Sequence, residues 1–317
     1  MKKIENHVAY VISVAALCCG LSACCSDPSQ KDVNLYTCAY ADSCYKANNY
    51  KEAVIKYEQA ANSGSAIAMT RLGDCSYHGR GLSKDYSKAV KYYTSAAWLG
   101  NAEAQYKLAN CYYWGNGVKK DYKKVVQWFE KSAKQGYADA QNNFGSCYSF
   151  GNGVAKDKSR AVTWYMKAAE QGNVKAQNNL GRYYGIDAGT PKDYSKAVTW
   201  FTEAAGHGDV GAFYNLGYLF HKGGYGIKRD FSKAIYWFEK AVEQGDVNAE
   251  FAIGLCYDLG GHGIKRDYSK AVRWYKRAAE KGHLSAMHNL GVCYLKGHGV
   301  RQSYSEAAYW QKQAKAK

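Results

Sequence analysis

The feature that most constrains this chain is a unit of about 36 residues that recurs through most of the sequence. Aromatic residues mark one position of the unit: Tyr92, Trp128, Trp164, Trp200, Trp237, Trp274 and Trp310. Each of the first six lies 17 residues before a small residue: Ala109, Gly145, Gly181, Gly217, Gly254 or Gly291. A unit this short cannot bury its apolar face alone, so neighbouring units must stack into a continuous core. The sequence therefore predicts a stack of units and not a single globule.

Length variation between the units is confined to one loop. The segment between the aromatic and the small residue never changes length. The interval from the small residue to a loop aspartate is 12 residues in 145–157 but 13 residues in 217–230 and 254–267. We therefore expect the constant segment to be the packed turn between units. The variable loop is expected to lie on the surface, where insertions are tolerated.

The unit at residues 101–136 predicts two helices joined by a glycine loop. The first helix has an apolar face at helical spacing: Ala104, Leu108, Ala109 and Tyr112. The second helix has a similar face: Val125, Trp128, Phe129, Ser132 and Ala133. Gly115 and Gly117 end the first helix because glycine adopts positive φ readily, and Asp121 is placed to cap the second. Trp128 is expected to fill the volume between layers. Glycine within a helix, as at Gly145, costs about 1 kcal/mol relative to alanine, which close packing should offset.

The unit resembles the Sel-1-like repeat, an all-helical relative of the tetratricopeptide repeat. The shared motif is A-x-x-x-L-G-x-x-Y, then G-x-G-V, then K-D-Y-x-K-A-x-x-W, then A-A-x-x-G, and residues 140–172 show it nearly complete. The resemblance covers the chain from about Leu35 to the C-terminus. Three departures are local: Tyr92 replaces the first tryptophan, Asp187 a loop glycine and Ser303 the last loop aspartate. The resemblance implies an all-α fold, a right-handed α/α superhelical solenoid of helix pairs.

The chain is divided on this basis into four segments. They are a signal peptide of the lipoprotein type at 1–23, a tether at 24–33, an N-terminal capping helix pair at 34–64, and seven Sel-1-like repeats at 65–317. Residues 34–64 lack the glycine loop, but Tyr57 and Gly64 lie 36 residues before Tyr93 and Gly100. That register supports a cap, because end units of solenoids are atypical.

The N-terminus has the pattern of an export signal. Lys2 and Lys3 precede an apolar run that is too short for a comfortable membrane span, and the run ends in Leu-Ser-Ala-Cys at 21–24. These four residues resemble the bacterial lipobox, which makes Cys24 the expected lipidation site; an ordinary secretory signal is the alternative. Its lipid chains would hold the protein on a membrane of the bacterial cell envelope. Resemblance to Gram-negative lipoproteins favours the outer membrane, at the periplasmic face or surface, because Cys25 follows instead of aspartate.

Eleven cysteines in an exported chain raise the question of disulfides. Five of them share one repeat position: Cys75, Cys111, Cys147, Cys256 and Cys293. Equivalent helices of neighbouring units lie about 9–10 Å apart or more, beyond the ~7 Å Cα limit for a disulfide, so we expect buried thiols. A bond between Cys38 and Cys44 would need a break in their helix. The histidines form no ligand pair at helical spacing, so no metal site is predicted.

The sequence lacks the motifs of common catalytic sites. It contains no nucleophile elbow, P-loop or paired-carboxylate motif. The glycines at 115 and 117 follow a predicted helix and not a strand, which favours a helix end over a phosphate loop. We therefore predict a protein that is not an enzyme, has no catalytic residues and needs no cofactor.

One row of residues is expected to line a binding groove. Superhelices of helix pairs present their first helices on the concave side. By analogy with tetratricopeptide units, the residue two before the small position faces that side: Arg71, Lys107, Asn143, Asn179, Asn215, Ala252 and Asn289. The asparagines could hydrogen-bond an extended peptide, and Lys107 and Arg182 could bind an acidic group. The alternative is that neighbouring side chains satisfy the asparagines.

A second candidate surface is a basic edge. Cations precede the predicted cap of each second helix: Lys84, Lys119, Lys120, Lys156, Lys192, Lys228, Arg229, Lys265, Arg266 and Arg301. With a net charge of +16, such an edge could attract anionic headgroups, anionic polysaccharide or acidic protein. The alternative is an ordinary solvated loop edge. Export disfavours nucleic acid as a partner.

Together these patterns predict a membrane-anchored repeat lipoprotein that acts as a non-catalytic protein–protein interaction scaffold and binds a peptide or protein in its concave groove. The resemblance implies roles such as envelope assembly, secretion scaffolding or host contact, without choosing among them. The alternative function is an envelope enzyme, or a cell-wall or polysaccharide-binding protein related to peptidoglycan.

Overall fold

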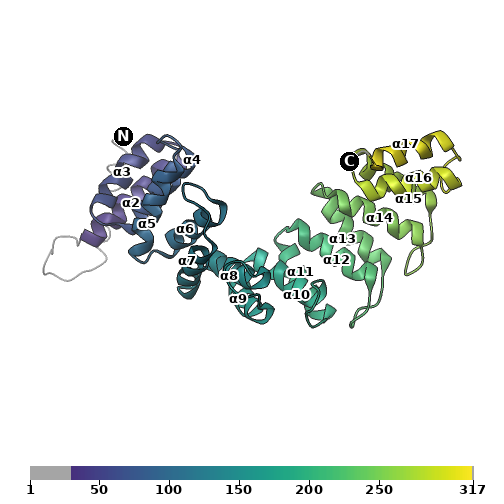
Figure 1. Cartoon of the computed structure of the whole chain (residues 1–317), viewed down its shortest axis with the longest axis horizontal. Helices are drawn as coiled ribbons and strands as arrows, with labels where there is room; N and C mark the ends of the chain where they lie inside the picture. Colours follow the sequence, from purple (N-terminus) through teal and green to yellow (C-terminus); the bar gives the residue numbers. More distant parts are fainter. Residues whose placement is uncertain (1–29, 316–317) are drawn as a thin grey trace, which may run out of the picture. The chain divides into compact units, whose positions relative to one another are not determined.

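The computed structural model describes residues 30–315, and this part of the chain folds into sixteen α-helices without a β-strand (Figure 1). The predicted signal peptide and Cys24 lie outside the described residues. The described chain divides into two compact units, residues 30–85 and residues 86–315. The predicted all-α fold is confirmed.

The first unit contains three helices: α2 (Gln30–Lys46), α3 (Tyr50–Asn62) and α4 (Ala66–His78). Helix α3 packs against both α2 and α4. Tyr57 of α3 and Leu72 of α4 are both buried. Helix α2 begins within the segment that the sequence predicted to be a tether.

The second unit contains thirteen helices of nearly equal length. They are α5 (Tyr86–Trp98), α6 (Ala102–Trp114), α7 (Tyr122–Lys134), α8 (Ala138–Phe150), α9 (Lys158–Glu170), α10 (Val174–Gly185), α11 (Tyr194–Gly206), α12 (Val210–Lys222), α13 (Phe231–Glu243), α14 (Val247–Leu259), α15 (Tyr268–Glu280), α16 (Leu284–Lys296) and α17 (Tyr304–Lys315). Each helix packs against its neighbours in the chain. None of the helices in residues 30–315 is both long and apolar enough to cross a membrane.

Clusters of buried residues join the second helix of one repeat to the first helix of the next. One such cluster joins α11 to α12 and includes Phe201, Leu216 and Leu219, all of them fully buried. Similar clusters join α9 to α10, α13 to α14, and α15 to α16. The segment of constant length is therefore the packed turn between units, as predicted.

The ends of the helices follow the predicted capping pattern. The Asp121 carboxylate accepts hydrogen bonds from the backbone N–H groups of Lys123 and Lys124 at the start of α7. Asp157, Asp193, Asp230 and Asp267 also cap their helices, and each accepts one backbone hydrogen bond. Helix α6 ends at Gly115, whose φ is +79°. The aspartate side chains satisfy backbone N–H donors that the start of a helix leaves unpaired.

A glycine inside four of the first helices, at 145, 181, 217 and 254, allows close contact with an aromatic ring of the same repeat. A Cβ atom at Gly145 would lie 2.8 Å from the Tyr165 ring, and one at Gly217 would lie 2.5 Å from the Phe238 ring. The expected close packing is confirmed. The role expected for the tryptophans is only partly correct: Trp128 is buried, but Trp164, like several of its equivalents, is only half-buried. The following residue, such as Tyr165, fills the core instead.

The variable loop does more than lie on the surface, because it contacts the preceding repeat. A Cβ atom at Gly153 would lie 2.3 Å from the carbonyl oxygen of Tyr122, the first residue of α7. In a longer loop, the backbone carbonyl of His262 accepts a hydrogen bond of 2.7 Å from the Phe231 N–H at the start of α13. The extra residue is accommodated by an isolated bridge between Gly261 and Ile264.

The cysteines of the described chain are buried free thiols. They are Cys38, Cys44, Cys75, Cys111, Cys147, Cys256 and Cys293. Burial raises the pKa of the Cys111, Cys147 and Cys256 thiols to about 12. The buried-thiol prediction is confirmed, and these three thiols stay protonated at neutral pH.

Candidate functional site

A cavity of about 280 Å³ lies between α6 and α8. Its lining comes from α6, α7, α8 and the loop after α8: Asn110, Tyr113, Trp114, Phe129, Asn143, Ser146, Cys147, Phe150 and Asn152. Trp114 and Phe150 occupy the last positions of α6 and α8, and they are 61% and 64% exposed. Large aromatic side chains that stay this exposed are typical of binding surfaces.

The cavity is lined by neutral groups. Its polar atoms belong to amides, hydroxyls and one thiol, and the floor contains the buried residues Phe129 and Cys147. Ser146 Oγ lies 3.2 Å from both the Asn142 carbonyl oxygen and the Tyr165 hydroxyl, so its hydrogen bonds are used within the fold. Since Cys147 is buried and protonated, it is not an activated nucleophile. This arrangement can bind a ligand through apolar contact and neutral hydrogen bonds.

Asn143, a residue of the predicted groove, lines this cavity and belongs to a chain of amide hydrogen bonds. Its Oδ1 accepts a bond of 3.1 Å from Asn142 Nδ2. Asn142 Oδ1 in turn accepts a bond of 2.9 Å from Asn179 Nδ2 of the next repeat. These side-chain amides therefore connect neighbouring repeats, and the contact uses one N–H donor of Asn179.

The other groove asparagines are also hydrogen-bonded within the protein. Asn215 Nδ2 donates to Asn178 Oδ1 at 3.1 Å, and Asn178 Nδ2 donates to Asp209 Oδ1 at 2.9 Å. Asn289 hydrogen-bonds the side chain of Tyr275. These contacts give the asparagines a structural role between helices, while an amide retains further hydrogen-bonding capacity for a ligand.

The charged residues of the predicted groove form ion pairs. Lys107 Nζ lies 3.0 Å from Glu103 Oε1, four residues earlier on α6. The Arg182 guanidinium lies 3.3 Å from Asp187 Oδ1, the aspartate that replaces a loop glycine. Both cations are therefore shared with an acidic neighbour, which reduces their attraction for an acidic ligand.

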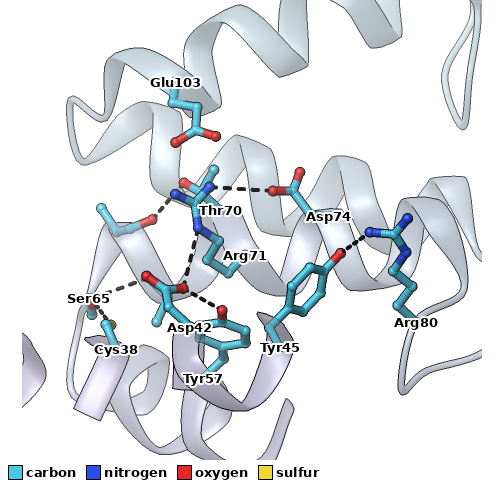
Figure 2. Close-up of polar contacts among 12 residues, drawn as sticks. Cys38, Asp42, Tyr45, Tyr57, Ser65, Thr70, Arg71, Asp74, Arg80 and Glu103 are labelled. Carbon is cyan, nitrogen blue, oxygen red and sulfur yellow. Dashed lines mark hydrogen bonds and ion pairs between the residues drawn. The ribbon is translucent and has the colours of Figure 1, made fainter. Parts of the chain in front are cut away.

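Arg71 lies in the first unit, within a network of polar contacts that Figure 2 shows. Its guanidinium is 3.7 Å from Asp42 Oδ1 and 3.5 Å from Asp74 Oδ2. The Tyr57 hydroxyl donates a bond of 2.5 Å to Asp42 Oδ1, and burial followed by this carboxylate raises the pKa of Tyr57 well above its ordinary value. Arg71 thus links α2 and α4, and it does not line the cavity.

The basic edge is exposed but serves partly to cap helices. Lys192 is half-buried, and the other nine members are exposed: Lys84, Lys119, Lys120, Lys156, Lys228, Arg229, Lys265, Arg266 and Arg301. Arg229 Nε donates to the Lys222 carbonyl at 3.1 Å, and Arg266 Nε donates to the Leu259 carbonyl at 3.1 Å. A cation at a helix C-terminus satisfies free carbonyls and complements the helix dipole.

Sequence reasoning missed most of the cavity. It named Asn143, but not Asn110, Trp114 or Phe150. Trp114 and Phe150 share the position just before the first loop glycine, where other repeats have residues such as Lys222. A pair of aromatic residues at an exposed helix end is the signal that could have identified the cavity.

A family model described as the Sel1 repeat matches seven stretches of the chain: residues 66–101, 102–137, 138–173, 174–209, 212–246, 247–283 and 284–317. The chain belongs to the Sel1 repeat family. The resemblance seen in the sequence is thereby confirmed, and the cavity lies at the junction of the Sel1 repeats at 102–137 and 138–173. The comparison with curated proteins gives no match.

Two solved structures place these Sel1 repeats among known folds. A protective antigen present in uropathogenic Escherichia coli strains, with an SLR fold, is 31% identical over 89% of this chain, with a TM-score of 0.79. The chain spans 61% of that antigen's length. A Sel1 repeat protein from Oxalobacter formigenes is 33% identical, with a TM-score of 0.64, over 78% of this chain and 99% of its own length. The fold is an all-α superhelical repeat.

Sel1 repeat proteins generally act as protein-interaction scaffolds, and their fold is typically non-catalytic. In residues 30–315, no group of three or more His, Cys, Asp or Glu side chains is arranged to hold a metal ion. The cavity between α6 and α8 combines neutral hydrogen-bonding groups with the exposed rings of Trp114 and Phe150.

Proposed function

We propose that this Sel1 repeat protein is a non-catalytic scaffold that binds a peptide or protein partner at the cavity between α6 and α8. The observation that carries the proposal is the combination of neutral amides, including Asn110 and Asn143, with the exposed rings of Trp114 and Phe150. Amides can pair with a peptide backbone, and aromatic side chains at the centre of an interface supply much of its affinity.

A photo-crosslinking experiment in cells tests the scaffold function. A photoreactive phenylalanine analogue replaces Phe150, and the control places it at Leu259, which ends α14 at the equivalent position and is 52% exposed. We expect a discrete protein adduct from position 150 and none from position 259. Absence of any adduct from position 150, with the variant folded and abundant, would count against a protein partner.

We also propose that the protein is anchored by lipid chains on Cys24 at the bacterial cell envelope, with the outer membrane favoured. The support is the basic start, the short apolar run and the Leu-Ser-Ala-Cys sequence at 21–24. Fractionation of cells that express wild-type protein or Cys24→Ala provides the test. Wild-type protein should be processed and sediment with membranes, whereas Cys24→Ala should not be processed at this site. An unprocessed wild-type protein in the soluble fraction would refute the anchor.

A further inference from the structure

Two lysines pack against the glycines that directly follow the aromatic residues Trp114 and Phe150 of the cavity. Lys120 and Lys156 precede the cap aspartates, and both side chains pack against the glycines that end α6 and α8. A Cβ atom at Gly115 would lie 3.0 Å from Lys120 Cγ, and one at Gly151 would lie 3.4 Å from Lys156 Cβ. Since these glycines directly follow Trp114 and Phe150, both lysine side chains start next to residues that line the cavity.

These lysines differ from the residues at the same position in later repeats. Arg229, Arg266 and Gln302 each donate a hydrogen bond to the carbonyl of the last or penultimate residue of a helix, at 3.1, 3.1 and 2.8 Å. In residues 30–315, neither Lys120 nor Lys156 forms an ion pair. Both lysines are exposed. Their charges are therefore available to a ligand.

The nearest aspartates along the chain are already engaged. Asp121 accepts two backbone hydrogen bonds at the start of α7 and lies 4.0 Å from Lys124 Nζ. Asp157 accepts a backbone hydrogen bond from Arg160 and lies 3.3 Å from its guanidinium. These two aspartates are therefore already paired with other groups, and the lining of the cavity itself is neutral.

We propose that the cavity takes one large apolar side chain of an extended acidic peptide, and that carboxylates flanking this side chain pair with Lys120 and Lys156. This inference rests on the proposed scaffold function and names the chemistry of its partner. A charged side chain is excluded from the cavity because its lining offers no opposite charge to offset desolvation. The rings of Trp114 and Phe150 suit an apolar anchor, preferably an aromatic one.

The size of the cavity and the two exposed lysines next to its lining residues both favour an acidic peptide. A volume of about 280 Å³ is at the small end of ligand sites, and suits one side chain better than a folded surface. A neutral sugar ring could stack on Trp114, but it would gain nothing from Lys120 and Lys156. Charge complementarity at a rim also accelerates association with an acidic partner.

The test measures binding of end-blocked, fluorescent heptapeptides to the full-length protein by fluorescence anisotropy. The first peptide has three aspartates on each side of a central phenylalanine. A second peptide replaces the phenylalanine by alanine, and a third replaces the aspartates by serines. We expect the first peptide to bind at least about tenfold more tightly than either of the others, a factor equal to about 1.4 kcal/mol.

Matched variants locate the contact. Phe150→Ala and Lys156→Glu should each weaken binding of the first peptide at least about tenfold. The control variants are Leu259→Ala, at the equivalent helix end, and Lys265→Glu, which makes the same charge change on an exposed loop. Both controls should bind within about twofold of wild type. Circular dichroism verifies that all four variants are folded.

Three results would overturn the inference. They are equal binding of the phenylalanine and alanine peptides, equal losses in the control variants, and binding of a neutral chito-oligosaccharide that depends on Phe150 when no peptide binds. If these peptides fail while position 150 still crosslinks to a protein in cells, the acidic-peptide inference falls and the scaffold function stands. If position 150 yields no adduct either, both fall.

Discussion

Replacing Gly153 with alanine tests whether the loop of one repeat is locked onto the preceding repeat. The added Cβ atom would lie 2.3 Å from the Tyr122 carbonyl oxygen and 2.7 Å from its carbonyl carbon, at the first residue of α7. Gly153 has φ of +76°, and this conformation costs an alanine roughly 1–2 kcal/mol. Relief of the backbone clash costs roughly 1–3 kcal/mol more. The free energy of unfolding should therefore fall by roughly 2–5 kcal/mol.

Gly172 provides a matched control in the same repeat. Its φ is +79°, close to that of Gly153, but a Cβ atom there would have no heavy atom within 4 Å. Gly172→Ala should therefore lower the free energy of unfolding by only roughly 1–2 kcal/mol, the cost of the backbone conformation. The difference between the two variants isolates the contact between the loop and α7.

Urea denaturation of the full-length proteins, followed by circular dichroism and by tryptophan fluorescence, measures both losses. Because an array of repeats can unfold in stages, the two signals must coincide before a single free energy is assigned. If they do not, hydrogen exchange of the α7 and α8 amides reports the stability of this junction directly. Equal losses in Gly153→Ala and Gly172→Ala would show that the loop does not hold the preceding repeat.

Three further predictions concern buried polar groups. Glu250 is fully buried, and its Oε1 lies 2.8 Å from the Arg277 guanidinium and 2.9 Å from Lys281 Nζ, so Glu250→Gln should lower the free energy of unfolding in urea by about 1–3 kcal/mol. The added change Lys281→Gln should recover part of this loss, since Gln105 and Gln135 form the equivalent pair, and no recovery would contradict a contribution from Lys281. Cys147 should resist N-ethylmaleimide in the native protein and react only on unfolding, as mass spectrometry would show, because burial raises its pKa to about 12; rapid native labelling would contradict this. Burial lowers the pKa of His221 below its ordinary 6.5, so the unfolded chain takes up a proton that the native protein resists, and stability should fall as pH decreases below 6.5. His221→Gln should flatten that decrease in urea titrations at several pH values, and an unchanged slope would refute the assignment.

The repeat made the fold predictable from the sequence, because many positions carry the same signal several times. The cap at Asp121, the helix end at Gly115 and the close packing at Gly145 each follow from local backbone chemistry. The same rules hold in several other repeats, for example at the cap Asp157 and at the helix end Gly151. They therefore predict helix bounds well from the sequence alone.

The candidate site was harder to predict because it depends on side chains that differ between repeats. Asn143 was identified from its register, but the hydrogen bond from Asn179 to Asn142 joins positions that are not equivalent in the repeat. Trp114 and Phe150 line a cavity only because two neighbouring repeats each place an aromatic residue at the end of the first helix. A contact between unlike positions of adjacent units leaves no periodic signal in the sequence.

The loop glycine that touches the preceding helix also bears on how such chains change in length. Gly117 meets Tyr86, Gly153 meets Tyr122, and Gly299 meets Tyr268, in each case at the first residue of a helix in the repeat before. If a recombination event deleted residues 102–137, Gly153 would meet the carbonyl of Tyr86 and the same contact would form again. Gene segments that encode whole repeats can thus be gained or lost without evolving a new junction, whereas deletion of half a repeat would destroy one.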